Sequence, residues 1–171
     1  MTKAPTPQEV WKNLSEYQLY KDWKRQNKHC FLSHFFCTIT GDFKAKTSWE
    51  VGFYDPVQEK ITVFSLLPSK EFQIKPADDI FKREEDTVEL LDISIVTHSV
   101  DEALETFKTK MPEYFPKEIL GDGFVSLQTL KQHTVWNCCF VTRSLKFVSL
   151  KIDAASGKPV SHDVMELMDK K

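Results

Sequence analysis

A helix-start signature occurs twice in this chain of 171 residues, once near the N-terminus and once just past the middle. Thr6-Pro7-Gln8-Glu9 combines an N-cap hydroxyl, a proline suited to the first helical position and a glutamate three residues after the cap. Ser99-Val100-Asp101-Glu102 repeats the cap and the glutamate. Because a helix is followed by strand patterns in both places, the chain can hardly be all-α or all-β.

Apolar residues at helical spacing follow each signature. After the first they are Val10, Leu14 and Tyr17, and we expect this helix to end in the basic segment 24–28, where cations complement the helix dipole. After the second signature the stripe ends at Pro112, which predicts the end of that helix.

Strand patterns fill most of the remaining sequence. We predict strands at residues 29–39, 47–54, 61–67, 124–130, 135–141 and 145–152. In the second of these, Trp49, Val51 and Phe53 alternate with less apolar residues, which is typical of a strand with one buried face. Two shorter strands are expected at residues 72–74 and 88–96, and a short polar helix or tail closes the chain.

The order of these elements divides the chain into two similar parts. We predict a first half at residues 1–75, a connector with a strand at 76–98 and a second half at 99–171. Trp49 and Trp136 each begin a hairpin at matching places in the two halves. The expected fold is α+β, with each half a helix packed on an antiparallel sheet, and the two sheets either lie side by side or join into one.

The second half resembles a known small module. Its hairpin from residue 134 leads into the apolar strand 145–152, and Asp153-Ala154-Ala155-Ser156-Gly157 follows as a turn. This run looks like the end of a PepSY domain, a cystatin-like α+β unit, and the helix beginning Asp101-Glu102-Ala103-Leu104 is similar to the opening helix of that family. The resemblance covers residues 99–161 and more faintly 8–67. It implies a module that binds or restrains peptidases, mostly outside the cell.

Composition and charge narrow the function classes. Apolar residues make up 41% and charged residues 28%, which are values of a globular protein. A net charge of −2 argues against a dedicated duplex-binding protein. Without a signal-peptide pattern at its start, or an apolar stretch of about eighteen residues, the chain is expected to be cytoplasmic and to have no membrane partner.

The four cysteines offer the clearest route to chemistry. His29, Cys30, His34 and Cys37 are suitable zinc ligands by type, but in one strand Cys30 and His34 would face one side and His29 and Cys37 the other. Cys138 and Cys139 lie among apolar residues, which favours unreactive thiols. The sequence therefore predicts no metal and no cofactor, and it leaves a thiol- or metal-dependent enzyme as a minor alternative.

Binding is the function that the sequence favours. We predict a non-catalytic module, monomeric or homodimeric, that binds a protein or peptide partner. Trp49 and Trp136 are interpreted as core anchors, or as partner-binding residues if they line a groove between the halves. The alternative is single-stranded nucleic-acid binding through the basic segment 21–28, where Trp23 accompanies Lys24, Arg25 and Lys28.

Overall fold

The computed structural model describes residues 5–79 and 87–167, apart from the side chains of residues 76–79. It is an α+β structure, as the sequence predicts. The elements, in chain order, are α1 (Pro7–Glu16), α2 (Gln18–Gln26), β1 (Phe31–Ile39), β2 (Glu50–Asp55), β3 (Lys60–Leu66), β4 (Phe72–Asp79), the 3₁₀ helix η1 (Ile93–Ile95), α3 (Val100–Tyr114), β5 (Leu120–Leu130), β6 (His133–Thr142), β7 (Lys146–Asp153) and β8 (Pro159–Glu166).

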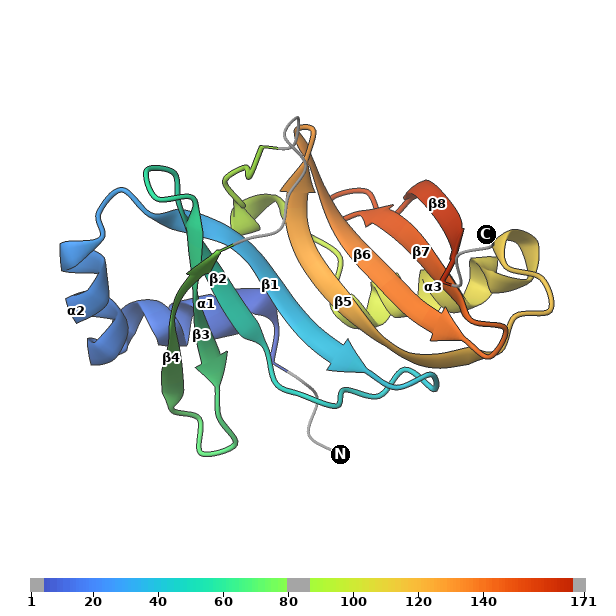
Figure 1. Ribbon diagram of the computed structural model, residues 1–171, viewed down its shortest axis with the longest axis horizontal. Coiled ribbons are helices and arrows are strands. Elements are labelled where there is room, and N and C mark those ends of the chain that lie inside the picture. The colour runs from blue at the N-terminus through green and yellow to red at the C-terminus, as the bar shows by residue number, and fades with distance from the viewer. Residues whose placement is uncertain (1–4, 80–86, 168–171) are drawn as a thin grey trace.

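The eight strands form one antiparallel sheet in the order β4-β3-β2-β1-β5-β6-β7-β8. Strands that follow one another in the chain are neighbours in the sheet, except that β1 pairs with β5 at the centre (Figure 1). Phe35 of β1 lies opposite Leu127 of β5, and Thr38 lies opposite Phe124. The β1–β5 pairing therefore joins the two runs of four strands into one sheet.

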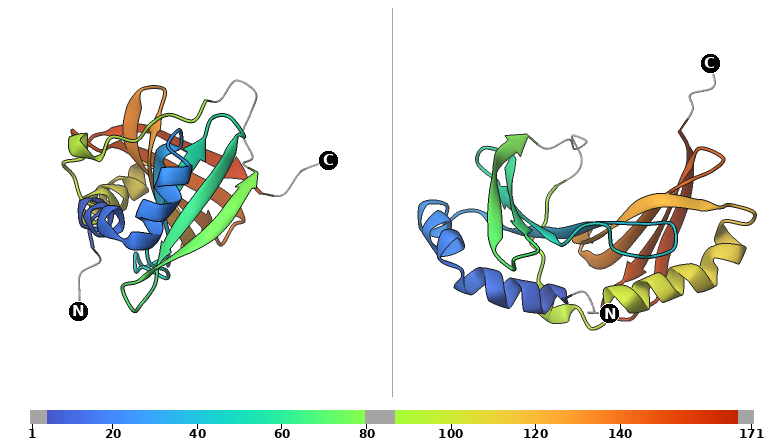
Figure 2. Two further views of the ribbon diagram at one scale, coloured as in Figure 1. Left: turned by 90° about the vertical axis from the view of Figure 1, so that its left-hand side faces the viewer. Right: turned by 90° about the horizontal axis from the view of Figure 1, so that it is seen from below.

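All three α-helices lie on one side of the sheet, and the outer strands curl away from them on the other side (Figure 2). The capping boxes predicted at Thr6 and Ser99 are both present and start α1 and α3. The core lies between the helices and the sheet, and one connected cluster of buried side chains spans both runs of strands. Its largest fully buried members include Trp136, Phe35, Phe53, Phe64, Phe107 and Phe140.

The prediction of one continuous first helix is wrong, because the structure has two helices there. Tyr17 is extended, with φ −77° and ψ 131°, and separates α1 from α2. Its ring makes an edge contact with Phe72 of β4 at a centroid distance of 5.4 Å. The second helix departs from expectation in the opposite direction, because α3 passes through Pro112 and ends at Tyr114. Proline removes only one helical hydrogen bond there, so the last turn survives.

Two expectations for the rest of the chain are wrong as well. Among residues 88–96 the structure has no strand: the segment is irregular as far as η1, where the Asp92 carboxylate accepts a hydrogen bond from the Ser94 N–H. The final segment is neither a helix nor a tail but the edge strand β8, paired with β7. Its residues are almost all exposed, so it lacks the apolar alternation that reveals a half-buried strand.

Some sequence expectations concern features outside these elements. The predicted connector begins within β4, and its residues 80–86 lie outside the described residues. Within residues 5–79 and 87–167, no helix combines the length and the apolar character needed to cross a membrane.

The packing predicts that buried side chains contribute far more to the free energy of unfolding than exposed ones do. Phe140 is fully buried and contacts Phe107 at a ring distance of 4.9 Å. Phe140→Ala should lower the free energy of unfolding by about 3–5 kcal/mol because it leaves a cavity. Val57→Ala is the control, since Val57 is 77% exposed and its loss should change stability by less than about 0.5 kcal/mol. Urea unfolding monitored by circular dichroism measures both, and equal losses would contradict the assigned core.

Candidate functional site

The two tryptophans that begin the matched hairpins lie in the core. Trp49 is 3% exposed and Trp136 is fully buried, with their rings 6.0 Å apart. Each indole N–H donates to a backbone carbonyl just before a helix: Trp49 to Pro5 at 2.8 Å and Trp136 to His98 at 2.9 Å. Of the two interpretations offered by the sequence, the structure places these residues as core anchors, and neither presents its ring to a partner.

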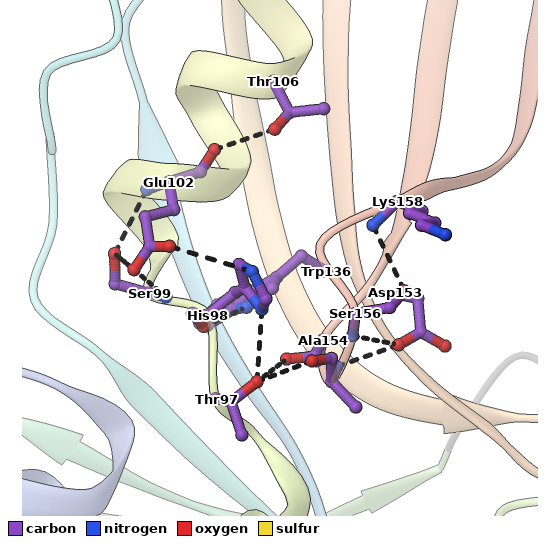
Figure 3. Close-up of polar contacts among 11 residues, drawn as sticks. Thr97, His98, Ser99, Glu102, Thr106, Trp136, Asp153, Ala154, Ser156 and Lys158 are labelled. Atoms are coloured by element: carbon purple, nitrogen blue, oxygen red, sulfur yellow. Dashed lines mark hydrogen bonds and ion pairs between the residues drawn. The ribbon is translucent and has the colours of Figure 1, made fainter.

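The turn that carries the PepSY resemblance holds the start of α3 against the sheet (Figure 3). The Asp153 carboxylate accepts hydrogen bonds from the N–H groups of Ala155 and Ser156, which fixes the turn. The Ala154 carbonyl then accepts from the N–H groups of Thr97 and His98, immediately before the helix. Gly157 has a φ of 75°, and a Cβ there would lie 2.5 Å from His98 Nε2. These contacts give the residues of the turn a structural role.

The basic segment at 21–28 is partly engaged within the chain. The Trp23 ring packs on Phe53 and Phe64, each at a centroid distance of 5.3 Å. The Lys24 ammonium donates to the carbonyl of Cys30, and Arg25 forms an exposed ion pair with Asp22. Lys28 is exposed. The arrangement offers one half-buried ring and a few exposed cations rather than an exposed stacking surface flanked by a basic groove.

A groove of about 1280 Å³ lies on the face of the sheet opposite the helices, and its lining residues come from the central strands and from the segment after residue 86. We call it the open-face groove. Its floor includes His34 and Phe36 from β1 and Phe124, Ser126, Gln128 and Val135 from β5 and β6. Phe36 and Phe124 are in contact across the two central strands, with centroids 5.3 Å apart. The sequence did not reveal this site because its residues alternate with core residues along several strands, and the pattern of a single strand does not show which other strands lie beside it.

The His34 ring lies in the floor of the groove, in the space that a side chain at residue 52 would fill. A Cβ at Gly52 would lie 2.0 Å from His34 Cε1, so only glycine leaves space for the imidazole. The Ser33 hydroxyl donates to the Gly52 carbonyl at 3.1 Å and lies 3.0 Å from His34 Nδ1. When the hydroxyl donates its one proton to the Gly52 carbonyl, Nδ1 acts as the donor in the second contact and Nε2 is the acceptor of a neutral ring.

Burial lowers the pKa of His34, and the nearby Glu50 carboxylate only partly offsets the effect. The imidazole is therefore neutral at pH 7. A neutral histidine in a groove with apolar and amide neighbours is a hydrogen-bonding group, and it does not contribute a positive charge to the floor.

Charged side chains lie at the rim of the groove. Lys131 and Lys151 line it together with one described carboxylate, that of Glu89, and with His133, whose Nδ1 lies 3.8 Å from Asp153 Oδ2. The Glu89 carboxylate accepts a hydrogen bond from the N–H of Gln132 at 3.0 Å, so it ties the segment at 87–89 to the tip of the β5–β6 hairpin. The rim cations are therefore only partly balanced.

The cysteines are all buried and unpaired by disulfides. Burial raises the pKa of the Cys37 and Cys139 thiols to about 12 and raises that of Cys138 as well. The structure also separates the residues of the sequence-derived metal set, because Cys37 belongs to the core and His34 to the groove. His29 and Cys30 instead lie beside Asp55, a residue that the sequence did not bring to attention.

Comparison with known proteins gives the fold and little more. No family model matches the chain, and no curated protein matches it. Among solved structures, a crystal structure titled as that of a "putative lipoprotein" from Clostridium difficile 630 is similar, with a TM-score of 0.52. The two are 11% identical, and the match covers 85% of this chain and 90% of that one. At this identity the likeness establishes a shared fold alone.

The seat of His34 predicts a measurable coupling. Gly52→Ala should lower the free energy of unfolding by about 1–3 kcal/mol because the new methyl group overlaps the imidazole. His34→Ala should relieve that overlap, so the double variant should be more stable than the sum of the single losses by about 1 kcal/mol or more. Gly52→Ala with Lys12→Ala serves as an additive control in the same urea experiment, because Lys12 is exposed on α1, away from this contact. Additivity of the first pair would contradict the described contact.

The raised pKa values of the buried thiols predict slow alkylation of these cysteines. In the native protein at pH 7.5, Cys37, Cys138 and Cys139 should react with iodoacetamide at least about tenfold more slowly than free cysteine, because both the thiolate fraction and the access are low. Mass spectrometry of peptides from native and urea-unfolded protein gives the rates. Rapid labelling of any of the three would instead revive a thiol-dependent enzyme.

Proposed function

We propose that the protein is a non-catalytic module that binds an extended peptide segment of a partner protein in the open-face groove. The observation that carries the proposal is the groove itself. Its volume of about 1280 Å³ exceeds the roughly 300–1,000 Å³ of ordinary small-molecule sites. A peptide of several residues is the kind of ligand that fits such a space.

The chemistry of the lining supports a peptide. Phe36 and Phe124 are half-buried and offer apolar surface, whereas the half-buried Gln128 amide offers hydrogen bonds of the kind that a peptide backbone needs. His34 contributes an acceptor on Nε2. Because the rim carries Lys131 and Lys151 against Glu89, the favoured segment is apolar with at least one acidic residue.

We further infer that the chain is an internal duplication. In support, a capped helix precedes four consecutive strands twice, and the sheet order reads outward in both directions from β1 and β5. The indole hydrogen bonds add an unexpected match, since Pro5 and His98 each directly precede the N-cap residue. The PepSY resemblance of residues 99–161 and the division at 1–75, 76–98 and 99–171 belong to this proposal.

The cellular setting follows from the sequence alone and stays a prediction. We retain a cytoplasmic protein, monomeric or homodimeric, as part of the proposal. Single-stranded nucleic-acid binding through residues 21–28 is the less favoured alternative, because Trp23 packs on Phe53 and Phe64 and Lys24 donates to Cys30.

Selection from a displayed library of random peptides tests the groove. Immobilised protein should enrich apolar peptides that contain Asp or Glu, and Gln128→Trp should weaken binding of the selected peptides at least about tenfold by filling the floor. Lys12→Trp, on the exposed face of α1, is the control and should bind as the unaltered protein does.

The proposal is wrong if no peptide is enriched, or if the enriched peptides bind Gln128→Trp as tightly as they bind the control. Binding that is lost on charge reversal of Lys24, Arg25 and Lys28 instead would place the ligand at the basic segment.

A further inference from the structure

Three side chains with metal-binding atoms, none of which lines the groove, meet where the chain enters β1 and leaves β2. One ring nitrogen of His29, the sulfur of Cys30 and one carboxylate oxygen of Asp55 lie within 4.8 Å of one another. His29 Nε2 and Asp55 Oδ2 are 3.0 Å apart. In a tetrahedral zinc site with bonds of about 2.0–2.3 Å, ligand atoms lie roughly 3.3–3.6 Å from each other. The three groups are therefore close to the spacing that a shared ion requires.

The fold fixes two of the three ligands. Cys30 is 4% exposed and directly precedes β1, and its N–H donates to the Asn27 carbonyl. Asp55 is 8% exposed and ends β2, where its Oδ1 accepts hydrogen bonds from the N–H groups of Val57 and Gln58. The other carboxylate oxygen, Oδ2, is the atom that faces His29. Preorganised ligands of this kind lose little freedom when an ion binds.

The third ligand leaves one side of the cluster open. The His29 side chain is 45% exposed, whereas the Asp55 side chain is 11% exposed. An ion held here would have three protein ligands and a position facing solvent for water. A carboxylate, a thiolate and a neutral imidazole together carry two negative charges, which match a divalent cation.

The existing contacts show what an ion would replace. The Asp55–His29 contact joins the start of β1 to the end of β2, and the Lys24 ammonium approaches the same corner through the Cys30 carbonyl. Burial and the Asp55 carboxylate raise the pKa of the Cys30 thiol, and Lys24 lowers it in part. Metal binding would release the thiol proton to solvent, because the thiolate is the ligand.

We propose that His29, Cys30 and Asp55 form a zinc site with one position open to water. The mixture of nitrogen, sulfur and oxygen donors suits zinc better than calcium or magnesium, which prefer oxygen ligands. The ion would join the segment just before β1 to the end of β2, and it would stabilise the folded chain because the cluster exists only after folding.

Cobalt is the sharpest probe, because a thiolate bound to Co²⁺ absorbs in the near ultraviolet while the free ion does not. Titration of the metal-free protein with Co²⁺ at pH 7.5 should give a thiolate-to-cobalt band that saturates at one equivalent, and Zn²⁺ should abolish it by displacement. Cys30→Ser should abolish the band. His29→Ala, which alters a half-exposed side chain, should weaken Co²⁺ binding at least about tenfold.

Cys37→Ala is the matched control, since Cys37 is also a buried thiol at β1 but lies outside the cluster. It should keep the band. The proposal is overturned if the unaltered protein shows no saturable band, or if Cys37→Ala loses the band while Cys30→Ser keeps it. Because a variant that fails to fold would also lose the band, circular dichroism of each variant accompanies the titration.

Thermal unfolding gives a second, independent readout. Addition of Zn²⁺ should raise the melting temperature of the unaltered protein and of Cys37→Ala, but not that of His29→Ala. An equal rise in all three would mean that zinc binds elsewhere. Peptide binding in the groove is unaffected by His29→Ala under this proposal, so the two hypotheses succeed or fail separately.

Discussion

The pairing of β1 with β5 is the contact on which the rest of the structure depends. Each run of four strands is a meander whose neighbours follow one another in sequence, and such a unit would leave its first strand as an exposed edge. Pairing those two first strands removes both edges at once and places Phe35 beside Leu127 on the buried face. The core can then run without interruption from α1 and α2 to α3, which gives one hydrophobic cluster instead of two small ones.

The helices are attached to this sheet by backbone hydrogen bonds as well as by packing. The residues before each N-cap supply carbonyl acceptors for the indole N–H groups of two buried tryptophans, and a buried polar group without a partner is costly. Trp49 and Trp136 satisfy Pro5 and His98, while Ala154 satisfies the N–H groups of Thr97 and His98. These hydrogen bonds give both tryptophans a structural role in the core.

The two proposed sites lie at the margin of the hydrophobic core, one on the open face of the sheet and one at the ends of two strands. With all three helices on one face, the other face of the central strands can hold polar side chains such as Ser126 and Gln128, and the curl of the outer strands shapes it into a groove. The His29–Cys30–Asp55 cluster lies where two strand ends meet, and strand ends bring together residues that are distant in sequence. Both locations lie at the margin of the hydrophobic core, where function can be added to the fold.

The sequence by itself determined the local elements. The capping residues Thr6 and Ser99 satisfy helix N–H groups within three residues, and the alternation at Trp49, Val51 and Phe53 expresses the two-residue period of a strand. Tertiary structure alone decided the break at Tyr17, the edge strand β8 and the union of the two sheets, because these depend on contacts with distant chain segments. It also decided both sites. His34 and Gly52 meet across paired strands, and Asp55 reaches His29 and Cys30 only when β2 lies beside β1, a pairing that no local pattern encodes.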